Sequence, residues 1–178
     1  MGQDCCAHKK MPQKPDHRAY LVEKIRLYRP LIVLTALSLC GALALSLAGR
    51  VPFMEAMMGL FLCFIAALKF FDLKGFTTTF ARYDVLAARL PLYGRTYPFI
   101  ELSLGLLFLS GFFPVLTSLV LIAVMIIGNI GVFGVIRRGT VVQCGCVGTG
   151  FNLPVGRVTF AENTIMLLMG VMTLLHHL

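Results

Sequence analysis

The 178-residue chain is too apolar for a soluble globular domain, because 58% of its residues are hydrophobic, only 13% are charged and its mean hydropathy is +0.85. We therefore expect an all-α membrane protein embedded in a lipid bilayer. The formal net charge of +8 does not indicate a nucleic-acid-binding protein, since the basic residues flank apolar runs instead of gathering with aromatic residues on one polar surface.

Residues 1–29 form a predicted basic tail. Cys5, Cys6 and His8 lie together in it, and thiols beside an imidazole suit a soft metal ion or a thiol partner. The alternative is that these cysteines are incidental, because a flexible tail loses conformational entropy on binding and offers no further ligand nearby. We favour the incidental alternative.

Residues 30–178 form the predicted membrane domain. Apolar runs divided by proline, glycine and charged residues predict five transmembrane helices in it. The predicted helices cover about residues 31–48, 53–71, 97–112, 115–136 and 158–175. Between the second and the third, aromatic residues at helical spacing, beginning with Phe76 and Phe80, predict a short amphipathic helix in the membrane interface over about 76–90.

Ionisable side chains are scarce inside the predicted spans. Glu101 lies just inside the third span, where a charged group is costly unless it is paired, so it is a functional candidate. The alternative is that Glu101 neutralises Lys69, Arg95 or a helix N-terminus. Glu55 and Lys69 lie near the two ends of the second span, from which we expect their charged groups to reach the membrane interface.

Two groups of three methionines lie in the second and the fifth predicted spans. They are Met54, Met57 and Met58, and Met166, Met169 and Met172. Flexible methionine side chains fill irregular helix contacts well, and we favour this packing role. A path for a soft metal ion is the alternative, and His176 and His177 at the end of the chain add two further donors to it.

A polar loop over about residues 139–157 carries Cys144 and Cys146 on either side of Gly145. Extended backbone puts two such Cα atoms near the upper limit for a disulfide, and Gly145 allows the turn that would bring them closer. A small, strained ring suits thiol exchange better than permanent bracing. The reduced pair would instead chelate a soft ion, and inert structural thiols are the third alternative.

The basic residues predict the orientation of the chain. Fifteen of the 16 Lys and Arg residues fall on one side of the five predicted spans, and Arg50 falls on the other. The positive-inside rule then places the N-terminus and the loop of Cys144 and Cys146 in the cytoplasm of a bacterial inner membrane. That side suits a partner of a cytosolic thioredoxin or glutaredoxin better than an exporter of disulfides.

Several short motifs in the membrane domain resemble those of one family. They are Lys69-Phe70-Phe71-Asp72, Arg82-Tyr83-Asp84-Val85-Leu86-Ala87, Tyr97-Pro98-Phe99-Ile100-Glu101-Leu102-Ser103-Leu104-Gly105, Arg137-Arg138-Gly139, Cys144-Gly145-Cys146-Val147-Gly148 and Glu162-Asn163. Over about residues 54–175 the chain resembles MauE/DoxX-type redox-associated membrane proteins. The resemblance implies a four-helix core, to which this chain adds an N-terminal helix, and a link to maturation of disulfide-containing methylamine dehydrogenase.

The same resemblance implies that Cys144 and Cys146 are the redox pair and that Glu101 is a framework or proton-handling carboxylate. We therefore expect thiol–disulfide exchange with a thioredoxin- or glutaredoxin-fold partner. A cycle across the membrane would also need an electron acceptor such as a quinone, for which the sequence shows no site. The alternative function is binding or transport of Cu(I) or Hg(II), with Cys5 and Cys6 joining the central pair as ligands.

Overall fold

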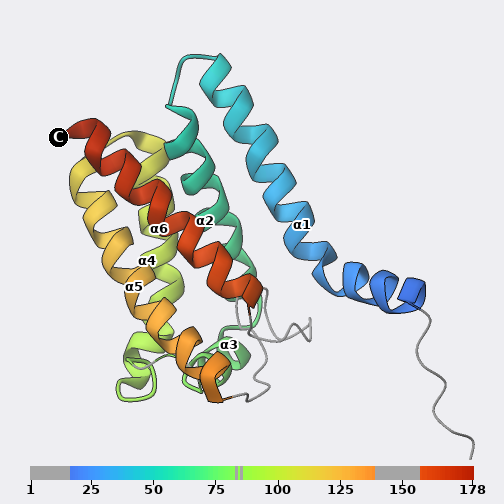
Figure 1. The fold of residues 1–178 in the computed structure, drawn as a ribbon. Helices are drawn as coiled ribbons and strands as arrows, with labels where there is room; N and C mark the ends of the chain where they lie inside the picture. The colour runs from blue at the N-terminus through green and yellow to red at the C-terminus, as the bar shows by residue number, and fades with distance from the viewer. Residues whose placement is uncertain (1–16, 83, 85, 139–156) are drawn as a thin grey trace, which may run out of the picture.

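The computed structural model describes residues 17–82, 84, 86–138 and 157–178 (Figure 1). Those residues form six α-helices and no strand, which confirms the predicted all-α class. In chain order the helices are α1 (His17–Leu47), α2 (Phe53–Phe71), α3 (Leu73–Phe80), α4 (Pro91–Ser110), α5 (Pro114–Arg138) and α6 (Arg157–His177).

The first helix, α1, runs along one side of the bundle and bends in its N-terminal part (Figure 1). Pro30 lies inside it and lacks the N–H that an unbroken helix needs, which accounts for a bend there. Helix α1 packs against α2 through the fully buried Ser38 and Ala42. A Cβ atom on Gly41 would lie 2.6 Å from Leu60 Cδ1, so a larger residue here would require the end of the Leu60 side chain to move.

Helices α2 and α4 make the most extensive contact in the bundle. Their backbones meet at Gly59 and Gly105. A Cβ atom on Gly105 would lie 2.8 Å from the carbonyl oxygen of Gly59 and 2.7 Å from Cys63 Sγ, distances at which something must move. Small residues at such crossings let membrane helices pack closely without a hydrophobic driving force.

The turn from α4 to α5 is tight. Gly111 and Phe113 both have positive φ angles, 69° and 51°, and Pro114 then opens α5. The chain returns antiparallel, but α5 packs chiefly against α6 and makes only minor contact with α4 (Figure 1). Between α5 and α6, Asn129 Nδ2 donates to Thr164 Oγ1 at 3.4 Å.

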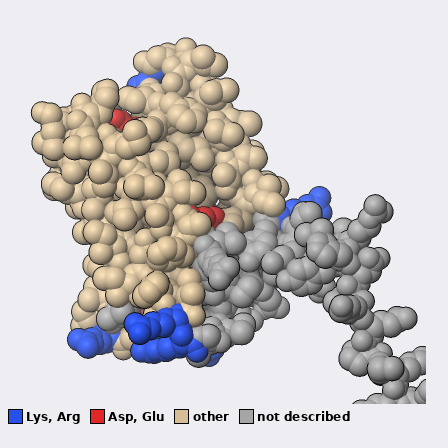
Figure 2. Space-filling model, in the orientation of Figure 1, with Lys and Arg blue, Asp and Glu red and all other residues tan. Residues whose placement is uncertain are grey.

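The outer surface of the bundle is apolar. Three segments of the described chain are long and apolar enough to cross a membrane. They are Arg29–Leu47, Phe53–Phe71 and Pro114–Arg138. Large side chains such as Leu37, Leu119 and Leu168 are exposed on the outer faces, and the visible face between the two ends of the bundle is mostly uncharged (Figure 2). Such a surface fits lipid and not water, so this is a membrane protein with several spans.

The aromatic helix predicted over about residues 76–90 is shorter and differently placed. Helix α3 starts after Asp72, whose Oδ1 accepts the N–H of Gly75 at 2.9 Å, and ends at Phe80. Phe76 and Phe80 were expected in the membrane interface, but they are 0% and 3% exposed. The aromatic face of α3 therefore closes one end of the protein core instead of lying on lipid.

A buried aspartate shapes the connection from α3 to α4. Asp84 is 1% exposed, and its Oδ1 accepts the N–H groups of Leu86 at 2.9 Å and Ala87 at 2.8 Å. Burial raises the pKa of Asp84, although the two N–H donors oppose the shift. An aspartate in this position caps a turn as an N-cap residue caps a helix.

Candidate functional site

Glu101 is the predicted site residue that the structure describes. Cys144 and Cys146, like Cys5 and Cys6, lie outside the described residues. The chain around the central pair leaves α5 at Arg138 and enters α6 at Arg157, and these two helix ends lie at the end of the bundle that also holds α3 (Figure 1). The geometry of the candidate site is therefore that of Glu101 and its surroundings at this end.

Glu101 on α4 forms an ion pair with Lys69 on α2. Lys69 Nζ lies 2.6 Å from Glu101 Oε1 and 2.5 Å from Oε2, so one ammonium group contacts both carboxylate oxygens. The two side chains are only 3% and 5% exposed. Two opposite charges removed together from solvent need this close geometry, because attraction must offset the loss of hydration of both groups.

Aromatic rings surround the ammonium group. Lys69 Nζ lies 4.7 Å from the centre of the Tyr97 ring and 5.0 Å from that of Phe76. The rings also pack on one another, with Tyr97 centred 4.5 Å from Phe80. A cation within about 6 Å of a ring centre is attracted to the ring face, so the aromatic side chains of α3 and α4 stabilise the charge that Glu101 neutralises.

Local sequence explains how these groups meet. Tyr97 and Glu101 are four residues apart on α4 and so share one helix face, where the Tyr97 side chain hydrogen-bonds to the Glu101 carboxylate. Lys69 lies in the last turn of α2, where a cation also favours the negative end of the helix dipole. The turn at Asp72 then brings Phe76 of α3 back over the Lys69 ammonium group.

The buried Lys69–Glu101 pair contradicts the expectation for Lys69 and identifies the charged partner of Glu101. Lys69 was expected to reach the membrane interface, and that expectation is wrong, because its side chain turns inward to Glu101. Of the three neutralising partners considered for Glu101, the structure shows Lys69. The signal in the sequence was a lone lysine in one apolar run and a lone glutamate in the next.

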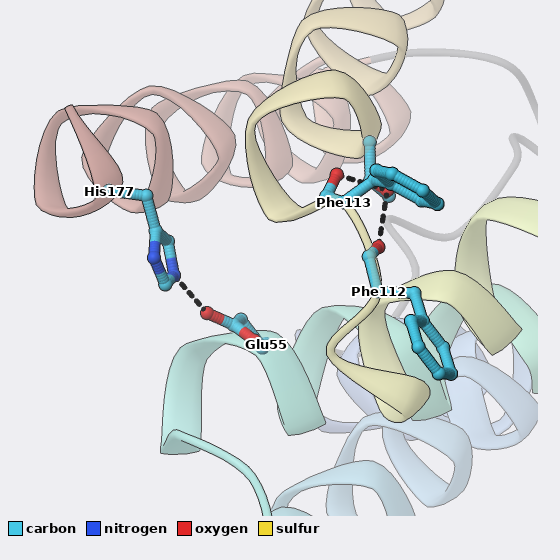
Figure 3. A network of polar contacts seen from close by, with 5 residues as sticks. Glu55, Phe112, Phe113 and His177 are labelled. Atoms are coloured by element: carbon cyan, nitrogen blue, oxygen red, sulfur yellow. Dashed lines mark hydrogen bonds and ion pairs between the residues drawn. The ribbon is translucent and has the colours of Figure 1, made fainter.

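Glu55 at the other end of α2 is also buried instead of reaching the interface. Its Oε1 lies 2.7 Å from Nε2 of His177, near the end of α6 (Figure 3). The Glu55 side chain is 5% exposed and that of His177 is 28% exposed. Sequence reasoning missed this contact, because only the fold brings the last helical turn of the chain to the first turn of α2.

A cavity of about 40 Å³ adjoins the Lys69–Glu101 pair. Its other walls include Thr159, Glu162 and Asn163 of α6, so polar groups from α2, α4 and α6 line the same space. A water molecule needs at least about 10–15 Å³ of such volume and two or more polar partners. The space is therefore large enough for ordered water, and the lining offers the hydrogen-bonding groups that water requires.

The described cysteines do not form a site. Cys40 is exposed on α1, Cys63 is partly buried on α2, and both are free. Within the described ranges, no group of three or more His, Cys, Asp or Glu side chains is placed to hold a metal ion. The ligand set considered for a soft metal, Cys5 and Cys6 with the central pair, lies outside these ranges.

Basic side chains gather at the end of the bundle where α5 ends and α3 lies (Figure 2). The exposed members of this basic end are Lys74, Arg82, Arg89, Arg95, Arg137 and Arg138. Arg50, between α1 and α2, is exposed at the opposite end. The bundle is thus electrically asymmetric along its axis, and the chain carrying Cys144 and Cys146 starts and finishes at the basic end.

The chain matches no curated protein and no solved structure. A family model does match, over residues 29–176. This range begins before the one expected from the sequence and takes in the apolar part of α1, so the family match includes the helix that the sequence predicts as an addition to the core. The DoxX part of the expected resemblance stays a prediction. Because the matching model describes the methylamine utilisation protein MauE and covers more than half of the chain, this protein belongs to the MauE family.

Proposed function

We propose that this MauE-family protein is a membrane thiol–disulfide redox protein whose reacting groups are Cys144 and Cys146. The observation that carries the proposal is where the chain bearing this pair is attached. It joins α5 and α6 at the basic end of the bundle, next to Arg137 and Arg138. Positive charge near a thiol favours the thiolate, which is the nucleophile in disulfide exchange.

The proposed reaction passes through a mixed disulfide. A thiolate of a reduced thioredoxin- or glutaredoxin-fold partner attacks one sulfur of the Cys144–Cys146 disulfide, forms an intermolecular S–S bond and releases the other cysteine as a thiolate. The second thiol of the partner then attacks that mixed disulfide. Two electrons pass to Cys144 and Cys146, the partner becomes oxidised, and the two released thiolates take up protons. In a cycle across the membrane, a quinone would accept the two electrons.

The proposed topology has five spans, with α4 and α6 crossing the membrane beside the three most apolar segments. Their 20 and 21 residues are long enough for a bilayer core of about 30 Å. Their polar groups, among them Glu101 and Glu162, line the interior cavity, whereas Phe99 and Leu168 are exposed on the outside. We place the basic end in the cytoplasm of a bacterial inner membrane.

Trapping of the mixed disulfide tests the proposal. A thioredoxin that keeps only its attacking cysteine should form a stable, reductant-sensitive adduct with the oxidised protein. Loss of the adduct in Cys144→Ser/Cys146→Ser, and its retention in the matched control Cys40→Ser/Cys63→Ala, would support the proposal. Equal adduct formation by the two variants, or a Cys144–Cys146 pair that does not titrate against glutathione in the purified protein, would contradict it.

A further inference from the structure

A second cavity, of about 100 Å³, lies among α1, α2 and α6 and opens to the outer surface, where its lining residue Ile165 is 56% exposed. Four of its lining residues are methionines, Met57 and Met58 from α2 and Met166 and Met169 from α6. These residues come from segments about a hundred positions apart in the chain, and the fold brings them to one space. We call this space the methionine cavity.

The remaining lining residues of the methionine cavity are two apolar side chains, a threonine and a glutamate. Phe61 and Ile165 contribute hydrocarbon surface. Thr35 uses its hydroxyl to donate to the backbone oxygen of Leu31 at 2.9 Å. Glu162 brings a carboxylate to the wall, and it lines the smaller cavity beside Lys69 as well. The donor set is therefore several thioethers with one carboxylate close by.

This donor set selects a narrow class of ligand. Thioether sulfur is a soft donor that prefers Cu(I) to hard ions such as Mg²⁺ or Ca²⁺, which take oxygen ligands. A single positive charge is also easier to place in an apolar space than a double one. Methionine side chains have three rotatable bonds, so four of them can close on an ion smaller than the cavity.

We propose that the methionine cavity is a binding site for a soft monovalent cation of the Cu(I) class. Packing explains methionines on one helix, but it does not require two methionines from each of two separate helices to line the same open space. The site differs from the cysteine ligands considered from the sequence, and it stands apart from the proposed thiol exchange. By joining α2 to α6, which otherwise make few contacts, a bound ion would also stabilise the bundle.

Silver titration of a cysteine-free chain tests the site. Ag(I) shares the charge and softness of Cu(I) and does not need a reductant. Cys5, Cys6, Cys144 and Cys146 are replaced by Ser, and Cys40 and Cys63 by Ala, which removes the proposed thiol chemistry. We expect calorimetry to show one Ag(I) bound per chain. Absence of saturable binding would overturn the proposal while leaving the thiol proposal intact.

Paired variants in that background locate the ion. Met57→Leu/Met169→Leu removes two lining thioethers with little change in volume. Met54→Leu/Met172→Leu removes two methionines of the same helices that do not line the cavity. The first pair should weaken Ag(I) binding at least about tenfold, and the second should leave it unchanged. Equal weakening by both pairs would overturn the assignment.

Methionine methyl NMR gives a second measurement on the unaltered chain, which has nine methionines. Cysteines take up silver first, but the methyl signals report the methionines alone. On further addition of Ag(I), the signals of the four lining methionines should shift, and those of Met54 and Met172 should not. Shifts in the second set, or in neither set, would contradict the proposal.

Discussion

Each end of α2 carries a buried charged residue, and the two residues are held in different ways. Lys69 at the basic end meets a carboxylate, with both side chains at most 5% exposed and aromatic rings over the ammonium group. Glu55 at the opposite end meets His177, which is 28% exposed. The first pair adjoins only a small interior cavity of about 40 Å³, whereas the second pair is partly open to the surface through His177.

The two charged pairs hold both ends of α2, but we expect one end to be more rigid than the other. Glu55 lies in the first turn of α2 and Lys69 in the last, so each charge also suits the helix dipole. At the basic end the ion pair is buried, and the small adjoining cavity cannot hold the bulk solvent that would hydrate a lone charge. At the other end, water can take the place of the imidazole. We infer that the basic end, where the chain of Cys144 and Cys146 is attached, is the rigid end.

The largest expected effect comes from leaving Glu101 buried without its partner. Lys69→Met should lower the free energy of unfolding by about 3–5 kcal/mol, because an unpaired charge remains in the core. The double variant Lys69→Met/Glu101→Gln should recover more than half of that loss, since Gln is neutral and still offers the Tyr97 hydroxyl a partner. Reversible unfolding in mixed micelles measures both. A double variant less stable than Lys69→Met would contradict the ion-pair account.

The helix crossing that supports the pair comes next. Gly105→Ala should lower the free energy of unfolding by about 1–3 kcal/mol, because the new methyl group would meet the backbone of Gly59 and the sulfur of Cys63. Gly134→Ala on α5 is the matched control, since nothing lies within 4 Å of its added Cβ atom. The control should keep or slightly gain stability through better helix propensity. Equal losses would refute the close crossing of α2 and α4.

The turn that Asp84 caps gives a further test of stability at the basic end. Asp84→Ala removes the acceptor of two backbone N–H groups and should cost about 1–2 kcal/mol. Asp84→Asn keeps an oxygen in that place and should cost less. Thermal unfolding of the two variants beside the parent measures the order, and a larger loss for Asn than for Ala would count against the cap.

The pH dependence of stability gives Asp84 a second test. Because burial raises the pKa of Asp84 above 3.8, the folded protein holds this proton more tightly than the unfolded chain does. Its contribution to stability is complete below pH 3.8 and is lost as the pH rises through the raised pKa. Asp84→Asn should remove this part of the pH dependence. An identical pH profile for parent and variant would show that Asp84 contributes none of it.

The smallest change in stability is expected at the Glu55 end of α2, where His177 is partly exposed. His177→Gln should change the free energy of unfolding by at most about 1 kcal/mol, because a partly exposed pair gains little and water can replace the imidazole. The same unfolding assay used for Lys69→Met gives a direct comparison. A loss as large as that of Lys69→Met would erase the distinction between the two ends.

Local sequence patterns predict helices in this fold, but they do not predict which side chains pack in its core. A membrane helix needs a continuous apolar run, so α2 could be predicted between Pro52 and Asp72. The spacing of Phe76 and Phe80 predicts a helix but does not tell lipid from protein core, and the structure places both in the core. The same limit applies to Lys69, which the sequence offered as one of three partners for Glu101.

Long-range neighbours were out of reach of sequence reasoning. The contact of Glu55 with His177 and the meeting of two methionine groups both depend on α6 lying beside α2, which no local pattern encodes. For the redox pair, the sequence is more informative than the structure. The motif around Cys144 and Cys146 predicts a chemistry from sequence, and the geometry of the two sulfurs lies outside the described residues.

Labelling of cysteines in intact cells tests most directly whether the basic end of the bundle, with its thiol pair, faces the cytoplasm. One variant keeps only Cys144 and Cys146, and a second is cysteine-free except for Arg50→Cys at the opposite end. After reduction with dithiothreitol and its removal, a membrane-impermeant maleimide is added. We predict that Arg50→Cys reacts in intact cells and that Cys144 and Cys146 react only after permeabilisation. Reaction of the thiol pair in intact cells would contradict the account.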